Sequence, residues 1–338
     1  MSHYVELKKH LLTHQYTWLI TGVAGFIGSN LLEALLHLNQ YVIGIDNFAT
    51  GFQRNIDEVL ANCSVTQKNA FKFYEADICN PPDCEKAVAG VDFVLHQAAL
   101  GSIPRSIANP QLVNSVNITG FVNMLVAANN ARVKRFVFAS SSSVYGDSPL
   151  LPKIESQIGN PLSPYAVTKQ TNELYAKAFS TCYNLETIGL RYFNVFGKRQ
   201  NYKSEYAAVI PLWIKSLLNK TPVYINGDGE SSRDFCFVEN AIQANLLAAT
   251  TTNTDALNRI YNVAFGQKTT LNDLFKIMSQ ILSIDEPIQY REFRHGDIRH
   301  SLANISNAKS LLGYDPSYDV KTGLNDMINW CLQHMRCE

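Results

Sequence analysis

The sequence predicts an α/β protein with a doubly wound parallel sheet, followed by a smaller mixed α/β lobe. Up to about residue 200, short runs that are apolar throughout alternate with helical stretches, as in strands that are buried on both faces of a parallel sheet. After that point the elements are short and mixed, with glycine, asparagine and proline between them. The length of 338 residues suits two lobes, because single hydrophobic cores stop growing near about 250–300 residues.

The expected elements follow in order along the chain. Residues 1–16 are expected to form an N-terminal extension with a short amphipathic helix near 4–12. Residues 17–200 should form the sheet domain and residues 201–338 mainly the second lobe, with part of 233–266 returning to the first domain. The expected strands are 18–21, 41–45, 71–74, 91–95, 136–138 and 187–190, and the expected helices include 29–38, 238–250, 270–283 and 321–334.

Charge and cysteine content restrict the possible partners. The 29 basic side chains equal the 29 acidic ones, so no global field attracts nucleic acid or an anionic membrane. The seven cysteines form no CxxC pair and no zinc-ligand spacing, which argues against a metal site and a disulfide framework. No segment has transmembrane length or the apolar core of a signal peptide. We therefore expect a cytoplasmic protein that uses no metal, nucleic acid or membrane.

A glycine-rich turn follows the first expected strand. Gly22 permits a tight turn, Gly25 lets backbone amides approach a pyrophosphate, and Gly28 lets the next helix pack closely on the strand. Asp46 ends the second expected strand, where a carboxylate accepts hydrogen bonds from an adenosine ribose. The pattern predicts a Rossmann domain that binds NAD rather than NADP, and Arg54 is the one nearby feature that would suit NADP.

The ends of the third and fourth expected strands should also line the cofactor cleft, because ligands bind at the carboxyl ends of strands in open α/β sheets. Taken singly, Asp77 is as readily a turn residue, and His96 is more often a hydrogen-bonded core histidine than a catalyst. The residues expected to line the cleft here are Asp77, Ile78, Gln97, Ala98 and Ala99.

A serine-bearing strand and a YxxxK helix predict a catalytic site. The strand runs into Ser141, Ser142 and Ser143, while Tyr165 and Lys169 lie four residues apart on one face of a helix. The ammonium of Lys169 is expected to lower the pKa of the Tyr165 phenol, and an oxidised nicotinamide would add to this effect. Ser141 is expected to position the proton of a reacting hydroxyl for Tyr165. A YxxxK pair alone is often an ordinary exposed pair, but its order after the glycine turn and the serines favours catalysis.

From about residue 17 to residue 320 these motifs resemble those of UDP-galactose 4-epimerases and their relatives among the extended short-chain dehydrogenases/reductases. The resemblance is strongest to the bacterial branch that prefers N-acetylated UDP-hexosamines. The matching signatures are residues 22–28, 46–48, 96–99, 117–120, 141–146, 164–169, 191–197, 233–235 and 294–297.

The resemblance implies further ligand contacts. Arg233 and Arg294 would each donate paired hydrogen bonds to diphosphate oxygens, and Asn194 would contact the diphosphate or the sugar. For the cofactor, the implied residues are Gly22, Gly25, Phe26, Ile27, Gly28, Asp46, Asn47, Phe48, Thr50, Gly51, Asn117, Tyr165 and Lys169. For the substrate, they are Gly101, Ser102, Ser141, Tyr165, Asn194, Ala208, Val209, Tyr224, Asn226, Arg233, Arg294, Asp297 and Ser301.

The implied reaction is 4-epimerisation of a UDP-N-acetylhexosamine, UDP-GlcNAc to UDP-GalNAc, through a 4-keto intermediate. It involves no net redox change, so NAD would stay tightly bound and be recycled in place. Ser301 stands where galactose-restricted relatives carry a bulky tyrosine, which leaves room for an acetamido group. Relatives commonly dimerise through a four-helix bundle, for which residues 111–130 and 165–183 would serve, and a role in surface polysaccharide synthesis is expected.

Other reactions remain open. The loop 198–206 lacks the Asp-Pro-Asn-Gly turn of the acetyl-preferring branch, and Lys198 and Lys203 would favour a carboxylated sugar, so a UDP-N-acetylglucosaminuronate 4-epimerase is the alternative. A UDP-sugar decarboxylase would share most motifs. A dehydratase would need an acidic residue that 142–144 lacks, and a non-catalytic NAD-binding protein would have no use for a Tyr and Lys together.

Overall fold

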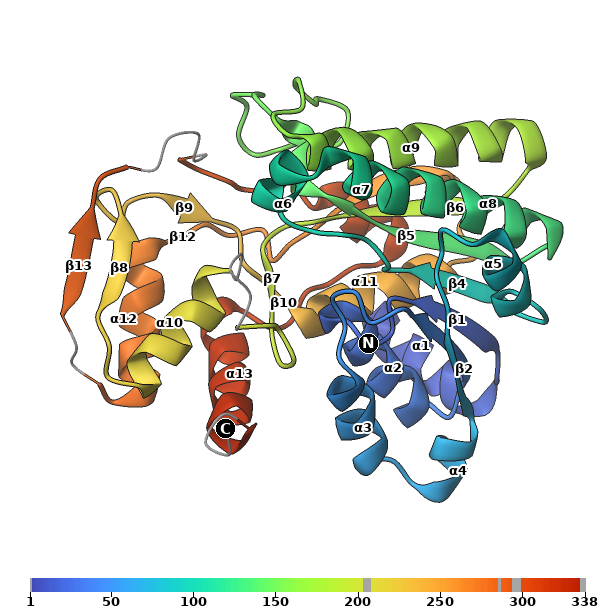
Figure 1. Ribbon diagram of the computed structural model, residues 1–338, viewed down its shortest axis with the longest axis horizontal. Helices are drawn as coiled ribbons and strands as arrows, with labels where there is room; N and C mark the ends of the chain where they lie inside the picture. Colours follow the sequence, from blue (N-terminus) through green and yellow to red (C-terminus); the bar gives the residue numbers. More distant parts are fainter. Residues whose placement is uncertain (1, 203–207, 285–286, 294–298, 335–338) are drawn as a thin grey trace.

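A seven-stranded parallel sheet forms the centre of the molecule, with the strand order β11-β6-β5-β4-β1-β2-β3 (Figure 1). The computed structural model describes residues 2–202, 208–284, 287–293 and 299–334. The chain places β2 and β3 on one side of β1 and β4, β5 and β6 on the other, so the strand order reverses between β1 and β4. Ligands bind at such a switch point in doubly wound sheets. The strands are β1 (Thr17–Thr21), β2 (Tyr41–Asp46), β3 (Phe71–Glu75), β4 (Phe93–His96), β5 (Arg135–Ser141), β6 (Thr187–Tyr192) and β11 (Arg259–Val263).

Helices cover both faces of this sheet, which confirms the predicted fold class. Alternate side chains of β1 enter different cores: Trp18 and Ile20 pack on the α2 and α11 side, and Leu19 packs on the α5 and α8 side. The first layer contains α1 (His3–Thr13), α2 (Phe26–His37), α3 (Gln53–Ala61), α4 (Val65–Asn69), α11 (Val238–Thr250), η3 (Thr254–Ala256) and η4 (Ala308–Leu312). The second contains α5 (Pro81–Ala87), α6 (Ile103–Ala108), α7 (Pro110–Asn114), η1 (Ser115–Thr119), α8 (Gly120–Asn130) and α9 (Pro164–Tyr183). The short η2 (Ser142–Tyr145) follows β5 and packs Val144 and Tyr145 into the first core.

The second lobe lies beside the end of the sheet and has its own apolar core (Figure 1). Residues 238–263 leave this lobe and supply α11 and β11 to the main sheet. The chain crosses between the lobes where β7 (Val195–Phe196) pairs with β10 (Cys236–Phe237). The remaining elements are α10 (Val209–Leu218), β8 (Val223–Asn226), β9 (Ser232–Arg233), β12 (Thr269–Thr270), α12 (Leu271–Leu282), β13 (Ile288–Arg291) and α13 (Val320–His334).

A buried arginine ties both lobes to the helices of the predicted cofactor domain. The side chain of Arg199 is only 1% exposed, and its guanidinium pairs with Glu33 of α2 at 2.7 Å and Glu58 of α3 at 3.0 Å. The indole of Trp330 on α13 donates to the same Glu58 carboxylate at 2.7 Å. Because removing one partner of a buried ion pair costs roughly 3–5 kcal/mol, this junction holds the lobes in a defined position.

None of the helices within the described ranges is both long and apolar enough to cross a membrane.

Candidate active site

The glycine turn after β1 brings the start of α2 close to the sheet. Gly22 has a φ of +72°, and a Cβ there would approach the backbone of Ala98 to 2.9 Å. A Cβ on Gly28 would overlap the carbonyl oxygen of Gly22, so only glycine lets α2 pack this closely. Gly25 is the N-cap of α2, whose first amides have no partner within the helix. The turn therefore presents backbone N–H groups and the positive end of a helix dipole to an anion.

Asp46 is held at the end of β2 by two backbone amides. Its Oδ2 accepts a hydrogen bond from Ala24 N at 2.9 Å and its Oδ1 accepts one from Phe48 N at 2.8 Å. Burial raises the pKa of this carboxyl, and the two amides oppose the shift. Each oxygen keeps a second lone pair, so the carboxylate can still accept from a ribose hydroxyl.

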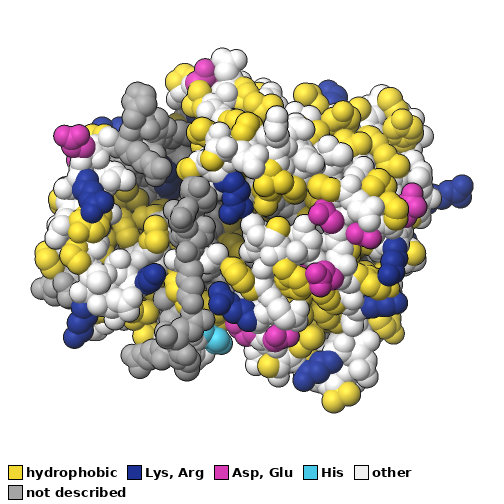
Figure 2. Space-filling model, viewed as in Figure 1, with side chains coloured by type: hydrophobic (Ala, Val, Ile, Leu, Met, Phe, Trp, Pro, Cys, Tyr) yellow, Lys and Arg dark blue, Asp and Glu magenta, His cyan; other side chains and the backbone are white. Residues whose placement is uncertain are grey.

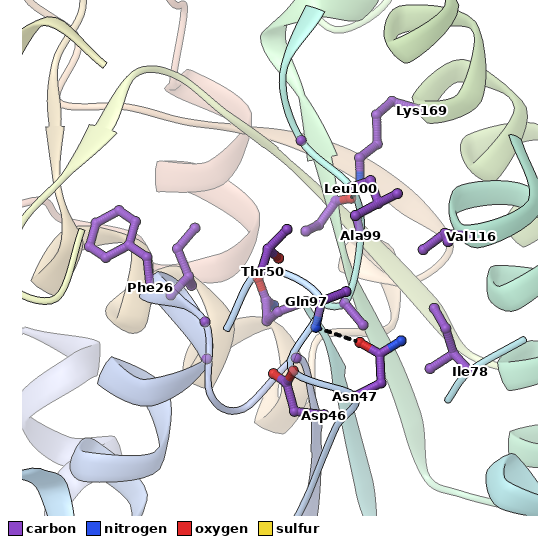
Figure 3. A pocket seen from close by; sticks show the side chains of 18 of the residues that line it. Phe26, Asp46, Asn47, Thr50, Ile78, Gln97, Ala99, Leu100, Val116 and Lys169 are labelled. Carbon is purple, nitrogen blue, oxygen red and sulfur yellow. Dashed lines mark hydrogen bonds between the residues drawn. The ribbon is translucent and has the colours of Figure 1, made fainter. Parts of the chain in front are cut away.

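A cavity of about 930 Å³ opens between the glycine turn, the carboxyl ends of the strands and α9. Its size lies within the range of cofactor sites, about 300–1,000 Å³. Figure 3 shows side chains from both sides of the switch point converging on it, among them Asp46, Gln97 and Lys169. The predicted residues on its wall are Gly22, Gly25, Phe26, Ile27, Gly28, Asp46, Asn47, Thr50, Asp77, Ile78, Gln97, Ala98, Ala99, Gly101, Ser141, Tyr165, Lys169 and Asn194.

Tyr165 and Lys169 project from α9 toward the end of β5. Lys169 is 2% exposed, its Nζ donates to the carbonyl of Ala139 at 2.8 Å, and it lies 5.9 Å from the centre of the Tyr165 ring. Burial lowers the pKa of Lys169 to about 8, although the carboxylate of Glu173 opposes this. At neutral pH the ammonium therefore keeps most of its charge.

The prediction that Lys169 lowers the pKa of Tyr165 is wrong when only the protein's own groups act on the phenol. Burial raises the pKa of the phenol, and the opposing group is Ser141, which hydrogen-bonds to it, rather than Lys169. The physical reason is that desolvation of the phenolate outweighs an ammonium that is itself engaged with a backbone carbonyl. Ser141 also accepts a hydrogen bond from Ser143 N at 3.1 Å, which orients its hydroxyl.

A second cavity of about 300 Å³ lies in the smaller lobe and shares Asn194 and Val195 with the first. The two cavities therefore adjoin through the segment after β6. Asn194 has a φ of +37°, and its side-chain amide donates to the carbonyl of Asp234 at 3.2 Å. The predicted substrate residues on this wall are Asn194, Ala208, Val209, Tyr224, Asn226 and Arg233.

Comparison with known proteins identifies the family. Residues 18–264 match the model of the NAD dependent epimerase/dehydratase family. The chain belongs to this family. A putative UDP-glucose 4-epimerase from Methanocaldococcus jannaschii is 36% identical over 321 residues, covering 94% of this chain and 99% of that protein. This epimerase/dehydratase is thus an NAD-dependent enzyme, which confirms the predicted cofactor, and the glycine turn and Asp46 suit the pyrophosphate and ribose of NAD.

Two solved structures share the whole architecture of this epimerase/dehydratase. One is a UDP-N-acetylglucosamine 4-epimerase from Methanobrevibacter ruminantium M1 in complex with UDP-N-acetylmuramic acid, which is 38% identical with a TM-score of 0.88 over 95% of this chain and 99% of that chain. The other is a UDP-glucuronic acid 4-epimerase from Bacillus cereus in complex with UDP-glucuronic acid and NAD, which is 29% identical with a TM-score of 0.84 over 94% and 99%.

Several predicted cofactor residues of the epimerase/dehydratase lie behind the cavity wall rather than on it. Asn117 is buried, and its side-chain amide exchanges two hydrogen bonds with the backbone of Leu100 and donates to Thr168, so it holds the wall in place. Gly51 lies against Asp46, where a Cβ would come within 2.9 Å of Oδ2. Phe48 packs on Phe73 with ring centres 5.4 Å apart.

The remaining predicted residues divide into three groups. Ser142 and Ser143 begin η2 and are not on the wall of either cavity, and the buried Oγ of Ser143 has no partner within the described part of the chain. Ser102 caps α6 through Arg105 N, and the amide of Ser301 donates to the carbonyl of Ser232, so neither lines a cavity. Arg294, Asp297 and Lys203 lie outside the described residues.

His96 is a core residue. It is 2% exposed, its Nδ1 shares a hydrogen bond with the hydroxyl of Thr21 at 3.0 Å, and burial lowers its pKa to about 3. It therefore stays neutral and takes no part in proton transfer near neutral pH.

Sequence reasoning missed other wall residues. Gln200 lines the second cavity, and its buried Oε1 has no partner among the described residues. In the first cavity, Tyr192, which was also not predicted, forms a closed ring of hydrogen bonds with the predicted Gln97 and with Asn245 of α11, with distances of 2.8–3.1 Å. These hydrogen bonds join strands and a helix that are far apart in the chain, so no local sequence pattern predicts them.

The glycine turn predicts that two glycine substitutions weaken NAD binding to different degrees. Gly28→Ala should weaken NAD binding about tenfold to hundredfold, because the methyl group overlaps the carbonyl oxygen of Gly22 and the turn must shift. Gly25→Ala should cost less, since its Cβ would sit 3.1 Å from the same oxygen. Titration of NAD into the stripped proteins, followed by protein fluorescence, measures both. Equal affinities for the two variants would contradict this account of the turn.

Proposed function

We propose that the protein is a UDP-sugar 4-epimerase and that its substrate pair is UDP-GlcNAc and UDP-GalNAc. The observation that carries the proposal is the shared wall at Asn194 and Val195. A ligand whose nucleotide occupies the smaller cavity can extend its sugar past this wall into the larger one, which contains Tyr165, Lys169 and Ser141. The family and the 4-epimerases among its relatives support the same reaction.

Each protein group has a defined task in this reaction. The glycine turn and Asp46 would hold NAD, which would supply the hydride chemistry at C4 of the sugar. Tyr165 takes the proton from the 4-hydroxyl and later gives it back, while Ser141 orients that hydroxyl. Burial disfavours the ionised phenol, so the positive charge of an oxidised nicotinamide would have to add to that of Lys169, which lies 5.9 Å from the ring centre. Arg233, on the wall of the second cavity, binds the diphosphate and so keeps C4 within reach in both sugar poses.

The first test removes the proposed base. Tyr165→Phe should lower turnover by about a factor of 10²–10⁴, because a general base contributes rate enhancements of this order. The amount of NAD that copurifies should be unchanged, since the glycine turn and Asp46 are intact. Product formation is measured by chromatographic separation of the two 4-epimers, and bound NAD by absorbance after denaturation. Wild-type turnover in this variant would rule out the proposed role of Tyr165.

Two observations favour the N-acetylhexosamine over its uronate. The ammonium of Lys198, which would suit a sugar carboxylate, instead pairs with Glu33 of α2 at 2.5 Å. A relative with 38% identity is a UDP-N-acetylglucosamine 4-epimerase. The UDP-N-acetylglucosaminuronate 4-epimerase remains the second candidate, because another structural relative acts on a uronate, UDP-glucuronic acid. A role in polysaccharide synthesis stays a prediction.

The choice of sugar has a direct test. The NAD-loaded enzyme is incubated separately with UDP-GlcNAc, UDP-GlcNAcA and UDP-glucose, and the 4-epimers are separated. The kcat/KM for UDP-GlcNAc should exceed the others by about tenfold or more, since a polar substituent that the pocket does not match costs this much. A preference for UDP-GlcNAcA would establish the second candidate, and loss of the carboxyl carbon from it would indicate a decarboxylase.

We also propose a homodimer that forms through α9 and its neighbours. Val167, Leu174 and Tyr175 share one face of α9 and are 45%, 63% and 40% exposed. Ile107 of α6 and Leu112 of α7, on helices that pack against α9, are 64% and 48% exposed. Figure 2 shows hydrophobic side chains over the part of the surface where Figure 1 places α7, α8 and α9. An apolar surface of this kind typically marks an association site.

A charge in this surface should separate the subunits. Leu174→Glu should convert a dimer into a monomer of 37.8 kDa, because a carboxylate in the centre of an apolar interface is left without a partner. Light scattering after size exclusion gives the mass. Leu12→Glu is the matched control: Leu12 is 49% exposed but lies on α1, and this variant should stay dimeric. A monomeric wild-type protein would contradict the proposal.

A further inference from the structure

Three side chains of α9 face the sheet at successive turns. Tyr165, Lys169 and Glu173 are spaced four residues apart, which places them on one face of the helix. Lys169 donates to the carbonyl of Ala139 and Tyr165 interacts with Ser141. Glu173 accepts a hydrogen bond from Ser140, the residue between these two, at 2.5 Å. The helix is thus attached to three consecutive residues of β5, and Glu173 makes the third attachment.

Glu173 is itself held by the neighbouring strand. Arg191 donates from Nε to Oε1 at 2.9 Å and from Nη2 to Oε2 at 2.7 Å, and the two side chains are 3% and 9% exposed. Arg191 stands opposite Ser140 in the register of β5 and β6. Its other contacts are the carbonyl of Glu155 at 3.0 Å and the ring of Tyr145, 4.8 Å away. A planar fork of this kind permits one orientation of the carboxylate, so Glu173 relates α9 to two strands at once.

Glu173 is also the negatively charged side chain among the buried ionisable groups around Lys169. The helices α7, η1 and α8, which pack against α9, carry no ionisable side chain. His96 is neutral, because its pKa is about 3. Glu173 is the group that opposes the effect of burial on Lys169. The ionisable groups on the elements that pack against α9 are Arg105 on α6, Arg135 on β5, Tyr145 on η2, and Arg191 and Tyr192 on β6, and His96 lies on the neighbouring β4.

We propose that Glu173 is a positioning residue for the epimerase reaction: it sets the register of α9 on β5, so that Tyr165 meets Ser141, and it places a carboxylate one turn along the helix from Lys169. Only the kinetic effect of Glu173 rests on the proposed function. The contacts of Glu173 and the protonation of Lys169 do not depend on a substrate. Glu173 is not itself on the wall of either cavity, and it acts through Lys169 and Ser140, which both line the first cavity.

The variant Glu173→Gln tests the charge while keeping the shape. The amide oxygen still accepts from Ser140, but burial then acts on Lys169 without an opposing carboxylate, so Lys169 loses its proton at lower pH. In the full NAD-loaded protein, the alkaline limb of the kcat/KM profile for UDP-GlcNAc should move to lower pH by about one unit. The KM should change less than about twofold, because the substrate contacts are intact. A profile that coincides with that of the wild type would overturn the proposal.

Two companion variants separate charge from position and from general destabilisation. Ser140→Ala removes the contact with Glu173 but leaves the ion pair, so kcat should fall while the alkaline limb stays in place. Glu186→Gln breaks a pair with Arg135 at the other end of the same strands, in which Glu186 is 41% exposed, and should leave the profile unchanged. If the Glu186 variant shifted the limb equally, the effect would be nonspecific and the proposal would fail.

A measurement without sugar distinguishes failure of this inference from failure of the proposed function. Protein labelled with ¹³C at the lysine ε-carbons is titrated in its NAD-loaded form, and the signal absent from Lys169→Met identifies Lys169. The midpoint should be lower in Glu173→Gln than in the wild type, because the carboxylate that opposes the effect of burial is absent. An unchanged midpoint would overturn the inference whatever the sugar, whereas a shifted midpoint in a protein without epimerase activity would reject only the function.

Discussion

The buried ammonium of Lys169 is the constraint on which the active site depends. A charge that is 2% exposed needs compensation, and it finds a carbonyl at the end of β5 and a carboxylate one turn along α9. These contacts attach the catalytic helix to the centre of the sheet. They also explain why the phenol of Tyr165 is not acidic by virtue of the protein alone: the same burial that holds the lysine disfavours the phenolate. The cavity thus holds Tyr165 and Lys169 side by side, and any further charge that favours the phenolate has to come from a bound ligand.

Each of the two lobes contributes one of the two adjoining cavities. The sheet domain provides a glycine turn and a ribose-binding carboxylate at the switch point, where a doubly wound sheet opens a crevice between diverging connections. The smaller lobe adds a cavity that adjoins this crevice at Asn194 and Val195. The buried pairs of Arg199 with Glu33 and Glu58 fix the junction, so the distance between the two binding regions is set by packing rather than by a flexible linker.

Local patterns were sufficient for the sheet, the glycine turn and the YxxxK helix. The alternation of apolar runs with helices, the three glycines and the spacing of Tyr165 and Lys169 each lie within a few turns of chain, and backbone geometry alone determines what they form. The same reasoning could not assign Asn117. An asparagine on the wall and one behind it look alike in sequence, and only the hydrogen bonds to Leu100 and Thr168 show that its amide is already engaged.

The sequence by itself thus determined the fold class, the cofactor and the placement of Tyr165 and Lys169 on one face of a helix, because these depend on contacts between near neighbours and on the fixed periods of helix and strand. Tertiary structure decided the electrostatics and the ligand-facing surface. The sequence suggested that Lys198 could bind a carboxylated sugar, but in the fold it pairs with Glu33, 165 positions earlier in the chain. The sequence also suggested an acidic Tyr165, but burial raises the pKa of this phenol. Desolvation and long-range pairing depend on which distant residues meet in space, and that information appears only when the chain is packed.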